Sequence, residues 1–178
     1  LLFSGLNGGL LEPPMPVGRL AAKTNDEVYW YLNKVQQHEN PITGPNGETE
    51  WMKRILHFAG GTNNSDAALF MSYLNGYKNT IEDTLFGGHV ISFAKNSTAP
   101  MQTSASDSIQ GYIGNGVALM TFFGHASATG GFDQSIDDPA QWNPQNGKYP
   151  VLLGNACLAG DIHLASGGSV SEDFVLID

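Results

Sequence analysis

The sequence predicts an α/β domain built around a mostly parallel sheet of about four strands. Four short apolar runs, most of them closed by Gly, alternate with segments that begin on helix-capping residues. The runs are residues 54–59, 89–93, 117–123 and 149–154. They are apolar throughout rather than alternating with polar residues, which is typical of strands covered on both faces. Strands that alternate with helices need right-handed crossovers, and such crossovers place the strands parallel to one another.

The composition excludes several classes of protein. The 178 residues include 8 Lys and Arg against 17 Asp and Glu, which gives a net charge of −9. This excess of acid argues against a nucleic-acid partner and against a polybasic membrane-surface protein. The single cysteine excludes a disulfide framework and an all-cysteine zinc site. No apolar run approaches the ~20 residues that a transmembrane helix needs.

The first 50 residues contain one predicted helix and a linker. Thr24 and Glu27 have the spacing of a capping box, so a helix is expected to begin after Thr24. Apolar residues continue at helical spacing from Val28 to Val35. Residues 41–50 are rich in Pro, Gly and Asn, and we therefore place the internal boundary of the chain there.

Further helices are expected between the apolar runs. Ser65 is the candidate N-cap of a helix that runs to about Lys78, and Ser104 or Ser106 is the candidate cap of a shorter one. Ser171 is the candidate cap of a last helix, and the chain stops soon after it. Because the sequence also lacks an initiator Met, we expect it to be a piece of a longer protein.

Residues 126–148 carry no long helical period, and a loop of this length in a compact domain is usually functional or disordered. Asp133, Asp137 and Asp138 lie in this loop and could offer oxygen ligands to a structural Ca²⁺ ion. Their spacing does not resemble an EF-hand loop, so a solvated loop is the alternative. We expect no other cofactor.

Two reactive side chains follow neighbouring apolar runs. His125 comes directly after the third run, and Cys157 after the fourth. Ligands of open parallel sheets bind beyond the carboxyl ends of the strands. If the two strands are neighbours, an imidazole and a thiol meet at one rim, which is the arrangement of a Cys–His hydrolase. The backbone N–H groups of Ala126 and Cys157 are then candidates for an oxyanion hole.

Other interpretations of these residues stay open. A lone cysteine in an apolar run is commonly an inert core residue. Cys157, Asp161 and His163, together with His125, could instead hold a metal, although their spacing matches no familiar zinc pattern. A serine hydrolase has no support, because the sequence lacks a Gly-x-Ser-x-Gly elbow.

Three segments resemble gingipain-type cysteine peptidases, a branch of the caspase-like clan. They are Pro16-Val-Gly-Arg-Leu20, Phe122-Phe-Gly-His-Ala-Ser127 and Leu153-Gly-Asn-Ala-Cys-Leu-Ala-Gly-Asp161. The resemblance implies a doubly wound caspase-like fold, with residues 1–50 as the end of a preceding subdomain plus a linker. Residues 51–178 would form a catalytic subdomain that is truncated at its C-terminal end. It further implies a protein or peptide substrate, with His125 as general base or acid and Cys157 as the nucleophile that forms a thioester.

The details are most similar to the sortase-like members associated with type IX secretion. This similarity implies trimming of secretion signals, partners within a secretion machinery, and a secreted or bacterial cell-surface (outer-membrane) location. Attack on the thioester by water would make the chain a protease, and attack by an amine would make it a transpeptidase. The sequence does not choose between the two.

Two positions near the first Gly-Gly pair bear on activity. Gingipains carry a glutamate where this sequence has Ala59, so we expect a Cys–His dyad whose histidine is oriented by a backbone carbonyl. Asp66 lies where the clan often places a specificity residue, and an acid there would favour Arg or Lys substrates. The alternative for Asp66 is a helix first-turn acid. Ala59 also favours a rival function, a non-catalytic caspase-like scaffold of a secretion machinery, which the retained His125 and Cys157 oppose.

Overall fold

The computed structural model describes residues 18–40, 49–96, 102–103, 106–136, 138–161, 163–164 and 168–178. Most of the linker at 41–50, the candidate cap Ser104 and the loop residue Asp137 therefore lie outside the described residues. The helices are α1 (Asn25–Glu39), α2 (Asn64–Ile81), α3 (Ser106–Gly114) and α4 (Val170–Val175), with 3₁₀ turns η1 (Glu50–Lys53), η2 (Pro139–Gln141) and η3 (Gln145–Gly147). Within these ranges, no helix has both the length and the apolar character needed to cross a membrane.

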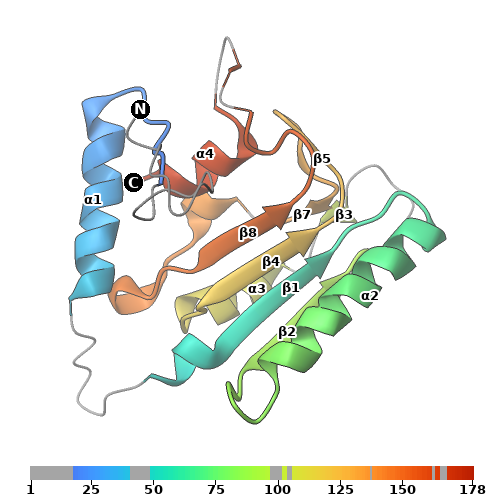
Figure 1. Cartoon of the computed structure of the whole chain (residues 1–178). Coiled ribbons are helices and arrows are strands. Elements are labelled where there is room, and N and C mark those ends of the chain that lie inside the picture. Colours follow the sequence, from blue (N-terminus) through green and yellow to red (C-terminus); the bar gives the residue numbers. More distant parts are fainter. Residues whose placement is uncertain are drawn as a thin grey trace, which may run out of the picture.

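The central sheet confirms the predicted architecture. Its strands are β1 (Arg54–Ala59), β2 (His89–Ala94), β4 (Leu119–Phe123) and β8 (Val151–Asn155), all parallel and in the order β2-β1-β4-β8. Two small sheets accompany it. One pairs β3 (Gln102–Thr103) with β7 (Gln134–Ser135), and the other pairs β5 (Ala126–Ser127) with β6 (Gly131–Phe132). Figure 1 shows α2 along one face of the central sheet and α3 behind the other.

Side-chain caps fix the starts of three helices. Thr24 and Glu27 form the predicted capping box of α1. Helix α2 is capped by Asn63 and not by Ser65, because the side-chain oxygen Oδ1 of Asn63 accepts the N–H groups of Ser65 and Asp66, which a cap must satisfy. Helix α4 is likewise capped two residues before the expected Ser171, by Ser169 in a capping box with Glu172.

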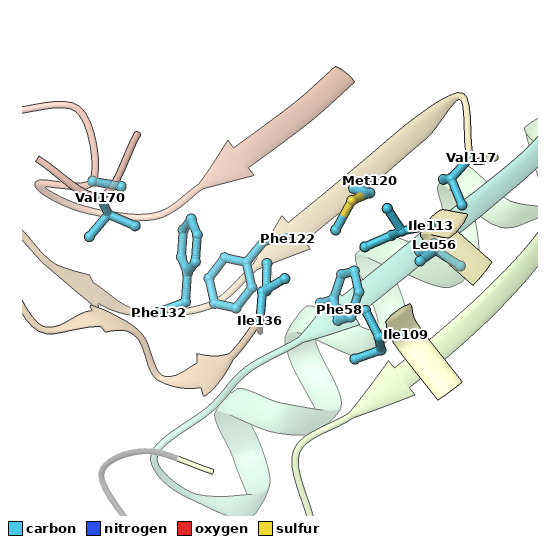
Figure 2. Close-up of a cluster of buried hydrophobic side chains, with 11 residues drawn as sticks. Leu56, Phe58, Ile109, Ile113, Val117, Met120, Phe122, Phe132, Ile136 and Val170 are labelled. Atoms are coloured by element: carbon cyan, nitrogen blue, oxygen red, sulfur yellow. The ribbon is translucent and has the colours of Figure 1, made fainter. Parts of the chain in front are cut away.

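The main hydrophobic core lies on the sheet face opposite α2. Leu56, Phe58, Met120 and Phe122 project from the strands into this core, and Figure 2 shows Ile109, Ile113, Val117, Phe132, Ile136 and Val170 packed around them. The rings of Phe122 and Phe132 have centroids 4.2 Å apart. Because Phe132 comes from the long 126–148 segment, this part of that segment is anchored in the core and is not a solvated loop. Burying one such side chain contributes about 2 kcal/mol.

The other face is only partly covered, which differs from the expectation that both faces of every strand are buried. Phe123 packs against Phe70 and Tyr73 of α2, with ring centroids 5.2 Å apart in both pairs. On β8, however, Val151 is 65% exposed and Leu153 is 51% exposed. Helix α2 packs over β1, β2 and β4, and β8 lies beyond its reach at the edge of the sheet.

His57 is a buried titratable group in the middle of β1. Its side chain is fully buried, and neither ring nitrogen has a hydrogen-bond partner among the described residues. Burial lowers the pKa of His57 from its usual 6.5 to about 4; Lys78 lowers it further and Glu82 opposes this. The folded protein therefore holds a neutral imidazole, whereas the unfolded chain takes up a proton at higher pH.

This difference predicts a loss of stability in mild acid. The stability that depends on a neutral His57 is fully present above pH 6.5, the usual pKa of histidine. It is lost as the pH falls toward the folded-state pKa of about 4. Urea unfolding at pH 7.5 and pH 5 should show His57→Leu losing about 2 kcal/mol less than the wild type over this interval. The exposed His89 serves as control, and His89→Leu should keep the wild-type loss. Equal pH dependence in all three proteins would contradict the prediction.

Candidate active site

The register between β4 and β8 brings His125 and Cys157 to the same rim of the sheet. Phe123 pairs with Asn155, and the N–H of Gly124 continues the ladder by donating to the Asn155 carbonyl at 3.3 Å. His125 and Cys157 each lie two residues beyond this paired position. Both are exposed, the His125 side chain by 47%. The sequence-based expectation that the two strands are neighbours is confirmed.

The chain turns sharply at the residue after Cys157. Leu158 has a φ of 60°, in the left-handed region that a leucine rarely adopts. A conformation of this kind costs on the order of 1 kcal/mol, and such residues cluster at functional sites. The turn is closed by the N–H of Asp161, which donates to the Leu158 carbonyl at 3.2 Å. The chain therefore leaves the rim immediately after the thiol, and the thiol remains accessible.

The His125 ring faces a carboxylate. Its Nε2 lies 3.4 Å from Oδ2 of Asp66, which is in the first turn of α2. The same oxygen accepts hydrogen bonds from the Thr62 hydroxyl at 2.9 Å and the Asn63 amide at 2.7 Å. The Thr62 hydroxyl lowers the pKa of the Asp66 carboxyl, partial burial opposes this, and His125 lowers it further. The rings of Phe70 and His125 form a T-shaped pair with a centroid distance of 5.3 Å.

The contact between His125 and Asp66 differs from the expectation that a backbone carbonyl orients the His125 ring. Ala59 is buried at the end of β1, as the sequence implies, but its carbonyl accepts the N–H of Lys95. The group opposite His125 Nε2 is the carboxylate of Asp66, where we expected a backbone carbonyl. A role of Asp66 in specificity stays a prediction. The available signal was the capping residue Asn63, which comes only four positions after the end of β1 and so places the first-turn acid near the rim.

A second carboxylate at the rim belongs to Asp133, which the sequence suggested only as a calcium ligand or as part of a solvated loop. Asp133 is only 7% exposed, and its oxygens accept the N–H of Gly61 at 2.7 Å and the N–H of His125 at 3.1 Å. The ammonium of Lys95, whose side chain is fully buried, lies 3.6 Å from Asp133 Oδ2. Asp133 is therefore a buried, paired group and not an exposed loop acid.

The remaining predicted site residues are described in part. Ala126 begins β5 opposite Phe132, directly after His125, and its role with Cys157 in an oxyanion hole stays a prediction. Asp138 is exposed and caps η2, whereas Asp133 is buried. Among the described residues, no three His, Cys, Asp or Glu side chains form a group that could bind a metal. The set of Cys157, Asp161, His163 and His125, considered from the sequence, is therefore not such a group. Calcium binding through this loop is thus untested.

Comparison with solved structures finds the same architecture in a known peptidase. The crystal structure of gingipain R, an Arg-specific cysteine proteinase, superposes with a TM-score of 0.64 and 18% sequence identity, over 88% of this chain. The fold class predicted from the sequence is therefore confirmed as caspase-like. The present chain covers 35% of the length of that proteinase.

Comparison of the sequence identifies the family. No curated protein sequence matches the chain. The sequence profile of peptidase family C25, however, matches residues 1–178, the whole of the sequence. Together with the gingipain fold and the His125–Cys157 rim, this match shows that the chain belongs to peptidase family C25.

Proposed function

We propose that the rim formed by His125 and Cys157 is the catalytic centre of a cysteine endopeptidase. The observation that supports this proposal is the register of β4 and β8, which brings an exposed thiol and an exposed imidazole to the same rim of the sheet. The carboxylate of Asp66 faces one nitrogen of that imidazole, so the other nitrogen is left for the thiol. Membership of a peptidase family supports a protein or peptide substrate.

The reaction follows from these groups. His125 removes the proton of the Cys157 thiol, and the thiolate attacks the carbonyl carbon of the scissile bond. The N–H groups of Ala126 and Cys157 are proposed to donate to the oxyanion, each contributing about 3 kcal/mol to the barrier reduction. His125 then gives its proton to the leaving amine, and a thioester remains on Cys157. Water, deprotonated by His125, hydrolyses the thioester and releases the acid product.

Asp66 is proposed to orient the imidazole in this reaction. Its carboxylate stabilises the imidazolium that forms when His125 holds the proton, as an acid does in Ser-His-Asp triads. Asp66 Oδ2 is shared among Thr62, Asn63 and His125, which favours this role over pairing with a cationic substrate. The site is then a Cys–His–Asp arrangement, although the family's glutamate position holds Ala59.

A finer proposal concerns the biological reaction. The segments around His125 and Cys157 are similar to those of the sortase-like members associated with type IX secretion. This similarity supports trimming of secretion signals at the bacterial cell surface, with a secretion machinery as partner. In such a reaction an amine can replace water in attacking the thioester.

The thiol reactivity of Cys157 tests the catalytic pair without a substrate. Iodoacetamide labelling, followed by mass spectrometry, should stay fast well below pH ~8.5, where an ordinary thiol is protonated. His125→Ala should slow labelling at pH 6 by roughly tenfold or more, because the imidazolium no longer stabilises the thiolate. The exposed His163 gives a matched control, and His163→Ala should label at the wild-type rate. Slow labelling that is equal in all three proteins would favour the scaffold function.

Peptidyl chloromethyl ketones that end in Arg or in Leu distinguish the two roles of Asp66. If Asp66 orients His125, Asp66→Asn should slow alkylation of Cys157 by both probes to the same degree, roughly tenfold. A selective loss of the Arg probe would instead assign Asp66 to substrate specificity. Asp26→Asn, which changes a first-turn acid of α1 instead, is the control and should alter neither rate.

Competition between water and an amine tests the finer proposal. A peptide substrate cleaved by the chain, incubated with a millimolar glycine-peptide acceptor, should yield the transpeptidation product as well as the acid. Both products should disappear in Cys157→Ala. An acid product alone, at saturating acceptor, would limit the chain to hydrolysis.

A further inference from the structure

One buried carboxylate joins the ends of three parallel strands at the rim. Asp133 accepts the N–H of Gly61 just after β1, accepts the N–H of His125 just after β4, and pairs with Lys95 just after β2. Its own N–H donates to the His125 carbonyl at 2.8 Å. The backbone of His125 is thus held by Asp133 through both its N–H and its carbonyl.

Glycines at two neighbouring positions leave room for this carboxylate. A Cβ atom on Gly124 would lie 2.7 Å from Oδ1 of Asp133, and a Cβ atom on Gly60 would collide with the same oxygen. A side chain at either position would displace the carboxylate from the two N–H groups that it accepts. Gly60 after β1 and Gly124 before His125 therefore leave the space that the Asp133 carboxylate occupies.

Lys95 makes the burial of this acid tolerable. An isolated buried carboxylate is costly, and a paired one is tolerated only when hydrogen bonds satisfy its oxygens as well. Asp133 meets both conditions, with two backbone donors and one ammonium. Removing one partner from such an arrangement leaves the other charge uncompensated.

The two loops held by Asp133 carry the histidine of the proposed catalytic pair and the acid that faces its ring. One loop contains His125, and the other runs from Gly61 to Asp66 in the first turn of α2. We propose that Asp133 is a positioning residue that, together with Lys95, fixes the main chain of His125 relative to Asp66. This inference rests on the proposed function, because Asp133 would affect the reaction only by positioning the His125 ring.

The test compares Asp133→Asn with a variant that removes both charges, Asp133→Asn combined with Lys95→Met. The control is Asp138→Asn, which changes an exposed acid of the same segment. Circular dichroism and thermal unfolding establish which variants are folded. Iodoacetamide labelling of Cys157 at pH 6 and ¹⁵N NMR titration of the His125 ring report on the site.

We expect a folded Asp133 variant to label Cys157 roughly tenfold more slowly and to show an altered His125 titration, while Asp138→Asn matches the wild type. If Asp133 acts through the His125–Asp66 pair, adding Asp66→Asn to it should produce little further loss, because the two changes are not additive. Additive losses would overturn that route of action.

The proposal is overturned if a folded Asp133 variant keeps both the wild-type labelling rate and the wild-type His125 titration. It is also overturned if neither Asp133 variant folds, because the Asp133–Lys95 pair would then be a requirement for folding. Failure of the proposed function is separately visible, since wild type and His125→Ala would then label equally slowly. In that case the His125 titration still decides whether Asp133 positions the ring.

Discussion

The placement of His125 and Cys157 at one rim of the sheet depends on the parallel register of β4 against β8. Because successive side chains of a strand point to opposite faces, a slip of one residue would turn every side chain to the other face. Met120 and Phe122 are buried in the core beneath the sheet, and Phe123 packs against α2 above it. The hydrophobic pattern of β4 therefore fixes where His125 leaves the sheet, and the register brings Cys157 to the same rim.

Two acids at the rim act on the same histidine from different sides. Asp66 is partly exposed and faces the imidazole ring, where its charge can respond to protonation. Asp133 is buried and holds the main chain of His125, where its charge is balanced by Lys95. The different exposure of Asp66 and Asp133 suits the two acids to different roles. A carboxylate that reaches solvent can stabilise a charge that appears and disappears, whereas a buried one is suited to holding fixed N–H groups.

The sequence predicted the features that have local signals and missed those that depend on distant partners. The strands, the α1 capping box and the positions of His125 and Cys157 follow from apolar runs and their ends. The contact of Asp66 with His125 joins residues 59 positions apart, and that of Asp133 with Gly61 joins residues 72 positions apart. The Asn63 cap is a local signal for the position of Asp66, but no local pattern identifies the distant partner of Asp66 or of Asp133. The exposure of β8 was missed for a related reason, because an apolar run does not tell an edge strand from a central one.

The solitary, exposed thiol of Cys157 also determines how the chain responds to oxidants. A sulfenic acid normally escapes further damage by condensing with a second thiol, but the 178 residues contain no other cysteine. Return to the thiol then requires an external reductant such as a small thiol, and oxidation past the sulfenic stage is irreversible. The same exposure that the proposed function requires of Cys157 thus makes the oxidation state of this thiol depend on the redox conditions around it.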